Sequence, residues 1–278
     1  MRFTHLAEQI YHRPWFITAE AHAAIRTVFE RAMSSGLLDS RLEESSLLDL
    51  FPKRRPLTID DATGIASIHV MGPLGKNLSK IEQSCGATGF EQIRADYAKA
   101  LEKSARGILL DFDSPGGTIT GTPELANLIA SKPLPTVAYT EDMMASAAYY
   151  LASGADVIVA SPSASVGSIG VYIPWMDTSA AYERAGYKPD PIVNTGGDLK
   201  AIGFGGKLSD AQRAHLQEEV DEDFDNFQAH IRQHRDVPDS AMRGQVMSGR
   251  KALESNLVDR IGERDEAFAA LALAIAAA

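Results

Sequence analysis

Cysteine is almost absent from this chain of 278 residues, and long basic stretches are missing as well. The single cysteine, Cys85, excludes an internal disulfide framework. Its neighbours are polar and include no base, which favours an unreactive thiol over a nucleophile. The formal net charge is −10 and no block of lysine and arginine occurs, so we expect no nucleic-acid partner.

Apolar runs are also short. The first residues lack the apolar core of a secretory signal, and no window reaches the ~18 to 20 apolar residues of a membrane helix. The nearest approach is the alanine-rich segment 265–278, which we interpret as a C-terminal helix. These absences predict a protein without a membrane anchor that acts in the cytoplasm.

Histidine, the usual catalytic base, is scarce where it would be needed. None lies between Ser146 and His215, and His215 falls on an expected helix whose polar neighbours indicate a solvent-exposed face. His230 and His234 are four residues apart, which could serve a metal, but no companion ligand is evident and a solvated helix face is favoured. His69 lies inside an expected strand as a half-buried residue. We therefore expect no metal and no cofactor, and a Ser-His-Asp triad has little support.

The order of elements divides the chain into three parts. We expect residues 1–57 to form a helical extension with a Pro-bounded linker. Residues 58–264 are expected to form the main domain, and residues 265–278 the terminal helix. From residue 57 onward apolar runs alternate with amphipathic segments, which is typical of an α/β fold with a largely parallel sheet. We expect strands at 64–71, 107–112, 136–139, 157–160 and 168–172, and helices at 5–13, 18–33, 90–104, 122–130, 145–153, 209–234, 238–247 and 250–255.

Two motifs in the main domain suggest acyl-transfer chemistry. The turn Asp113-Ser-Pro-Gly-Gly117 follows an expected buried strand, and its glycines let backbone N–H groups approach a ligand closely. Such donors stabilise a developing oxyanion by roughly 3 to 4 kcal/mol each. Ser146 stands among alanines, which leaves its hydroxyl accessible to a substrate. An ordinary strand-to-helix turn and a plain helix N-cap serine are the simpler interpretations of these motifs.

A serine nucleophile needs a base, and a lysine can supply it when its amine is uncharged. Burial among apolar groups favours that form of an amine. Lys200 has a less polar neighbourhood than Lys188 or Lys207, although its many nearby glycines also fit a flexible surface loop. Ser168, in the turn Gly167-Ser-Ile-Gly170, could hydrogen-bond the amine and orient it, or could be a simple turn serine.

Together these motifs resemble the signal peptide peptidase A (protease IV) family of Ser–Lys peptidases. The matching stretches are Asp113–Gly117, Ala145–Tyr150, Val166–Val171, Gly197–Lys200, and Gly249–Ala252 with Leu257–Gly262. The resemblance implies the ClpP/crotonase-like superhelix of repeated ββα units, with Ser146 as nucleophile, Lys200 as general base and Ser168 orienting the lysine. It places the oxyanion hole at the amides of Gly116 and Ala147. One departure is that Ala147 and Ala148 stand where the family usually has two glycines.

The N-terminal extension, with Pro14-Trp-Phe-Ile-Thr-Ala-Glu20, resembles the phage and prophage branch of this family. Members of that branch are capsid assembly, or head maturation, proteases. The resemblance therefore implies protein substrates such as capsid and scaffold proteins, a procapsid or host-cytoplasm location, and a homo-oligomer. Three alternatives remain open: a host peptidase that clears signal peptides, an inactive assembly scaffold, and a crotonase-type acyl-CoA enzyme.

Overall fold

The computed structural model describes residues 10–11, 13–34, 54–79, 82–83, 86–131, 133–204 and 207–277. These residues form two units. Unit 1 comprises Met1–Trp15 with Val171–Asn226, and unit 2 comprises Phe16–Gly170 with Phe227–Ala278. Cys85 and most of the expected helix at 5–13 lie outside the described residues, and the three-part division of the chain stays a prediction. Across the described ranges, no helix combines the length and the apolarity needed to cross a bilayer.

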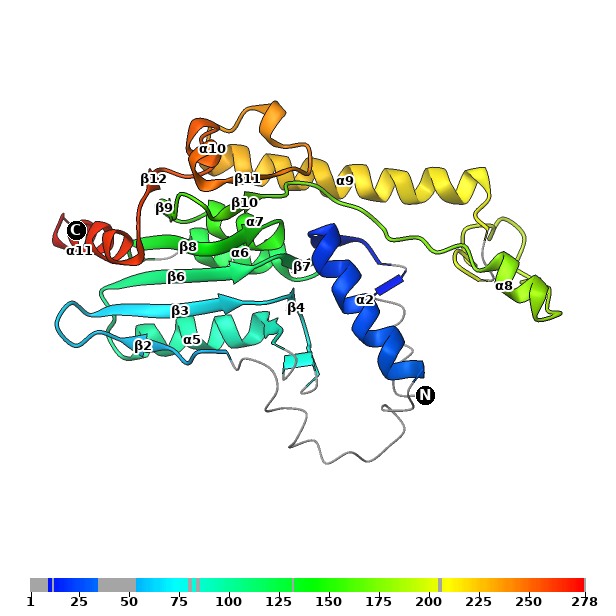
Figure 1. Cartoon of the computed structure of the whole chain (residues 1–278), viewed down its shortest axis with the longest axis horizontal. Helices are drawn as coiled ribbons and strands as arrows, with labels where there is room; N and C mark the ends of the chain where they lie inside the picture. Colours follow the sequence, from blue (N-terminus) through cyan, green and yellow to red (C-terminus); the bar gives the residue numbers. More distant parts are fainter. Residues whose placement is uncertain are drawn as a thin grey trace. The chain divides into compact units, whose positions relative to one another are not determined.

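The main sheet of unit 2 has eight strands in the order β11-β10-β8-β6-β3-β2, with β9 paired to β8 and β12 paired to β9. Its central strands β3, β6, β8 and β9 are parallel (Figure 1). They are almost continuously buried, as parallel strands covered on both faces should be. The predicted α/β fold with a largely parallel sheet is thus confirmed. The strands are β2 (Thr58–Ile59), β3 (Ile65–Met71), β6 (Gly107–Ser114), β8 (Thr136–Ala145), β9 (Val157–Ala160), β10 (Ser165–Gly167), β11 (Val246–Ser248) and β12 (Arg260–Ile261).

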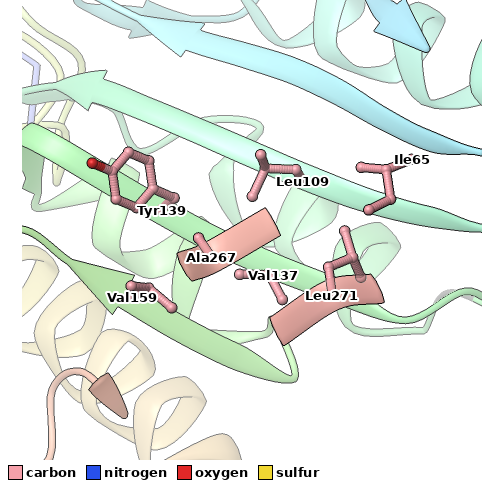
Figure 2. Close-up of a cluster of buried hydrophobic side chains, with 7 residues drawn as sticks. All are labelled: Ile65, Leu109, Val137, Tyr139, Val159, Ala267 and Leu271. Carbon is pink, nitrogen blue, oxygen red and sulfur yellow. The ribbon is translucent and has the colours of Figure 1, made fainter. Parts of the chain in front are cut away.

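Helix α11 (Arg264–Ala277) covers one face of this sheet. Its Ala267 and Leu271 pack against side chains from four parallel strands (Figure 2), namely Ile65, Leu109, Val137, Tyr139 and Val159. Side chains alternate between the faces of a strand, so the intervening residues point to the opposite face. Helices α5 (Phe90–Glu102), α6 (Thr122–Ala130) and α7 (Ala147–Ser153) bury their apolar sides in the same unit.

A second, four-stranded sheet has the order β1-β7-β4-β5. Strand β7 (Gly116–Thr118) lies between β4 (Leu74–Gly75) and β1 (Trp15–Ile17), and β5 (Thr88–Gly89) pairs with β4. Directly after β1, Thr18 caps helix α2 (Ala19–Ser34): its Oγ1 accepts a hydrogen bond from the N–H of Ala21 over 3.3 Å. Thr18 is therefore the N-cap of α2.

Unit 1 contains helix α8 (Ser179–Arg184) and the first part of helix α9 (Asp210–His234), which continues into unit 2 at Phe227. The segment between α8 and α9 is largely exposed, and large apolar side chains such as Ile192 and Phe204 face solvent in the described residues. Helix α9 agrees closely with the helix expected at 209–234.

The expected helix at 238–247 is wrong over most of its length. A single 3-10 turn (Asp239–Ala241) is followed by β11, because residues 246–248 pair antiparallel with β10. The next helix, α10 (Gly249–Glu254), begins directly after β11. The strand expected at 168–172 lies earlier, at 165–167, where it pairs with the end of β8. Both errors come from long-range pairing, which outweighs local propensity in short segments.

The α11 face of the sheet also carries a partly buried polar cluster. His69 of β3 and Asp111 of β6 are directly paired in register, and His69 Nδ1 lies 3.2 Å from Asp111 Oδ2. Arg264, at the start of α11, donates to the same carboxylate oxygen over 3.2 Å. Burial works to raise the pKa of Asp111, but the contacts with His69 and Arg264 outweigh it and hold the pKa below its ordinary value. His69 thus has a partner within the sheet, and it is buried rather than half-buried as predicted.

Replacing Asp111 by Asn should change how the protein responds to acid. The folded chain binds this proton less readily than the unfolded chain, so Asp111 stabilises the fold above about pH 4 and loses that effect as the pH falls through its folded value. We expect Asp111→Asn to lower the free energy of unfolding at pH 7 by about 1.5 to 3 kcal/mol and to flatten its decline in acid. Denaturant titrations between about pH 7 and 3 measure both effects. Asp61→Asn, at an exposed turn, is the control and should keep the wild-type curve; parallel curves for Asp111→Asn and wild type would contradict the role.

Candidate active site

Ser146 lies at the junction between β8 and α7, and its backbone is held in an unusual conformation. Its φ is 53° and its ψ −117°, a region that residues with a side chain rarely adopt. Two hydrogen bonds fix this turn: the Ser146 N–H donates to the Gly167 carbonyl over 2.8 Å, and the Ser146 carbonyl accepts from Tyr150 N–H over 2.8 Å. Strained conformations of this kind persist when the surroundings determine them, and they concentrate at functional sites.

The hydroxyl of Ser146 is sealed in the protein. The residue is 0% exposed, and within the described part of the chain its Oγ has no hydrogen-bond partner. A buried unpaired hydroxyl costs roughly 1 to 3 kcal/mol, and most buried polar groups avoid this cost. The protein therefore retains an unfavourable group at the most constrained point of the β8–α7 junction, as expected for a nucleophile.

Gly116 lies against this serine, where β6 gives way to β7. Its φ is 104°, and a Cβ at this position would come within 2.9 Å of Ser146 Cβ and would overlap the carbonyl oxygen of Phe16. A Cβ at Gly117 would overlap the Leu74 carbonyl of β4 in the same way. Only glycine fits at either position, so the Gly-Gly pair of the motif has a steric cause.

The amide of Gly116 has a partner within its own loop. Its N–H donates to Ser114 Oγ over 3.2 Å, and Ser114 Oγ donates to the Gly72 carbonyl over 2.7 Å. Ser114 is 0% exposed, so this short relay ties the Gly116 loop to the turn that follows β3. Ala147, the other residue expected to supply an oxyanion donor, is also fully buried at the start of α7.

Ser168 comes to the same place through strand register. Strand β10 runs parallel to β8 with Gly167 paired to Ala145, and each strand is followed by a serine, Ser168 and Ser146. Ser168 is also buried with a positive φ of 53°, and its N–H donates to the Gln245 carbonyl over 2.8 Å. The structure thus brings together four of the five predicted site residues: Ser146, Ser168, Gly116 and Ala147.

Lys200 belongs to unit 1, whereas the other four belong to unit 2. It occupies an exposed turn in which its N–H donates to the Gly197 carbonyl over 2.9 Å. The partnership of its amine with Ser146 stays a prediction, and so do the catalytic roles of the other residues.

An aromatic cluster next to the serine was missed in the sequence. Tyr150 of α7 stacks on His230 at a ring-centroid distance of 4.2 Å and lies 4.8 Å from Phe227, both residues of α9. Phe16 of β1 completes the cluster, 4.7 Å from Phe227 and 5.7 Å from Tyr150. The interpretation of His230 as part of a solvated face is wrong, because the residue is 7% exposed and its ring faces Tyr150. The spacing of Phe227, His230 and Ile231 along the helix was the available signal.

Burial in this cluster changes the titration of its polar members. Burial is the main cause that lowers the pKa of His230 to about 4, and the nearby His234 lowers it further. The hydrogen bond with the Tyr150 carbonyl raises this pKa, but its effect is weaker. Burial, with Glu124 adding to it, raises the pKa of Tyr150 to about 12. Both rings are therefore uncharged at neutral pH and contribute apolar surface where α7 packs against α9.

Comparison with known families identifies the chain. The model of peptidase family S49 matches residues 129–277, which include β8, α7, β10 and all of α9. The chain belongs to peptidase family S49. The predicted resemblance to the signal peptide peptidase A (protease IV) family is thereby confirmed, whereas the Ser–Lys dyad stays a prediction.

Relatives within family S49 include both bacterial and phage proteins. The putative signal peptide peptidase SppA of Enterococcus faecium is 31% identical over 177 residues, covering 61% of this chain and 51% of the relative. The capsid assembly protease C of Escherichia phage lambda is 28% identical over 211 residues, covering 74% of this chain and 48% of the relative. The head-tail preconnector protein GP5 of Enterobacteria phage P21 is 28% identical over 219 residues, covering 76% of this chain and 43% of the relative. The chain spans about half the length of these relatives.

Removing the Ser146 hydroxyl should stabilise the fold, because Ser146→Ala deletes an unpaired buried polar group and leaves the backbone unchanged. We expect the free energy of unfolding to rise by about 1 kcal/mol. Ser153→Ala is the matched control in the same helix: Ser153 is equally buried, but its Oγ donates to the Tyr150 carbonyl over 2.8 Å. That variant should lose about 1 kcal/mol. Chemical denaturation measures both values, and equal destabilisation by the two changes would show that Ser146 Oγ is paired.

Proposed function

We propose that this chain is a serine endopeptidase that uses Ser146 as nucleophile and Lys200 as general base. The observation that carries the proposal is the Ser146 hydroxyl, buried without a partner on a strained turn beside Gly116. Membership of peptidase family S49 supports the reaction class. The matching motifs support the ClpP/crotonase-like arrangement and the homo-oligomer that the resemblance implies.

The reaction begins when the uncharged Lys200 amine takes the proton of Ser146 as Oγ attacks the substrate carbonyl carbon. The amides of Gly116 and Ala147 stabilise the oxyanion, and Ser168 orients the lysine. The ammonium then protonates the departing amine, leaving an ester on Ser146. A water molecule activated by Lys200 hydrolyses the ester and restores both side chains.

Protein substrates follow from this chemistry. The names of the lambda and P21 relatives support a capsid assembly role, in which the chain cuts capsid and scaffold proteins in the host cytoplasm or the procapsid. The Enterococcus faecium relative supports the second candidate, a signal-peptide-peptidase-like protease. Incubation with candidate capsid and scaffold proteins or with signal peptides, followed by mass spectrometry of the products, separates the two candidates.

Both members of the dyad should be indispensable. We expect Ser146→Ala and Lys200→Ala each to reduce peptide cleavage by at least roughly 10³-fold while the circular dichroism spectrum stays unchanged. Lys207→Ala, a second exposed lysine of the same segment, is the control and should retain wild-type activity. A fluorophosphonate probe should label the wild-type chain and not Ser146→Ala. Substantial cleavage by Lys200→Ala would point to another base, and an unlabelled, folded wild-type chain would support an inactive scaffold.

The cleavage rate should rise with pH, because only the uncharged amine accepts a proton from serine. Initial rates measured between about pH 6 and 9 test this dependence. A rate that stays constant across the range would count against a lysine base.

A further inference from the structure

The strand that carries Gly116 has a neighbour on each edge. On one side β7 pairs with β4, whose Leu74 is aligned with Gly117 and is 2% exposed. On the other side lies β1, a strand of three residues from the N-terminal extension. Strand β4 follows β3 after a two-residue turn and is part of the sheet framework. The edge held by β1 is therefore the one from which a strand could be displaced.

A peptide cleaved at Ser146 has to use that same edge. Extended peptides bind proteins by adding a strand to a sheet edge, where main-chain hydrogen bonds hold them. For the scissile carbonyl to lie beside Gly116 and Ser146, the substrate must run along β7 at Gly116. The Phe16 carbonyl already lies there, since a Cβ on Gly116 would overlap its oxygen, and Thr18 N–H donates to the Pro115 carbonyl over 3.0 Å.

Phe16 fixes this strand through its side chain. It is 1% exposed and packs against Tyr150 and Phe227, with ring centroids 5.7 Å and 4.7 Å away. Tyr150 lies one helical turn after Ser146, and its N–H bonds to the Ser146 carbonyl. The site of the Phe16 ring is thus a pocket for one large apolar side chain, directly connected to the nucleophile's turn.

In this structure, with β1 in place, neither the Ser146 hydroxyl nor the Gly116 amide is available to a substrate. Ser146 is 0% exposed, so no substrate atom can reach its hydroxyl. The Gly116 amide donates to Ser114 Oγ and is already engaged before any oxyanion forms. Opening the site requires a change at the point where Phe16, Gly116 and Ser146 meet.

We infer that β1 is a built-in pseudosubstrate, which occupies the peptide-binding edge of β7 with Phe16 in a pocket for a large apolar side chain of the substrate. This inference rests on the proposed peptidase function. Displacement of β1 frees the edge of β7, and peptides with an aromatic or bulky aliphatic residue at the position of Phe16 compete best for it. The resident strand has the advantage of being tethered, which gives it an effective concentration of roughly millimolar.

The test compares the full chain with its Phe16→Ala variant. A fluorophosphonate probe measures access to Ser146, with Ser146→Ala as the blank. We expect Phe16→Ala to be labelled at least roughly tenfold faster than wild type, because the open state becomes more populated. Phe268→Ala is the matched control: it removes a partly buried phenyl ring of α11, which packs against a different cluster, and should keep the wild-type labelling rate.

A second measurement covers the case in which Phe16→Ala does not fold. A synthetic peptide with the sequence of residues 13–20, Arg-Pro-Trp-Phe-Ile-Thr-Ala-Glu, is added to the wild-type chain. It should slow Ser146 labelling in a concentration-dependent way, and the same peptide with alanine in place of phenylalanine should be at least roughly tenfold weaker. Where Phe16→Ala folds, the phenylalanine peptide should inhibit it at lower concentrations than wild type.

The outcomes separate the two proposals. Ser146-dependent labelling at one rate in wild type, Phe16→Ala and Phe268→Ala, with neither peptide inhibiting, overturns the pseudosubstrate and leaves the peptidase standing. Faster labelling in both phenylalanine variants also overturns it, since general destabilisation then explains the access. No Ser146-dependent labelling in any folded variant overturns the peptidase, and the pseudosubstrate with it.

Discussion

The close approach of backbones at Gly116 is the constraint on which the candidate site depends. A strand end, a nucleophile turn and the N-terminal strand all converge on one α-carbon that carries no side chain. The left-handed conformation of Gly116 turns the chain from β6 into β7, and the space left by the absent Cβ is filled by the Phe16 carbonyl and Ser146 Cβ. Any side chain at this position would separate the nucleophile from the loop that faces it.

The parallel sheet explains why the residues of the candidate site lie close together. Strands β6, β8 and β10 are neighbours, and their carboxyl ends meet at one edge, where the Gly116 loop, Ser146 and Ser168 follow. Binding sites of open α/β sheets form outside the carboxyl ends of the strands for the same reason. The register of these strands places their ends at the same edge. Packing against α11 and the contacts of Asp111 with His69 and Arg264 stabilise that register.

The sequence predicted most of this framework, because its signals were local or carried by motifs. The apolar run at 107–112 and the amphipathic segment at 209–234 specify β6 and α9 without further context. The motifs also singled out Gly116, Ser146 and Ser168, which follow three neighbouring strands, although their catalytic roles stay predictions. The misplaced strand at 168–172 and the false helix at 238–247 depend on the pairing of β10 with β11, which no local pattern encodes. Phe16 was hidden for the same reason: its partners Tyr150 and Phe227 are more than a hundred residues away along the chain.

The two adjacent glycines also restrict which positions of the candidate site can carry different side chains. Since neither Gly116 nor Gly117 admits a Cβ, this part of the candidate site presents only main-chain groups and has no side chain that could distinguish one peptide sequence from another. If the proposed peptidase function holds, selectivity among sequences has to come from neighbouring side chains, such as the rings of Tyr150 and Phe227 that contact Phe16. Substitutions intended to alter the candidate site should therefore begin with those two rings and leave the glycines unchanged.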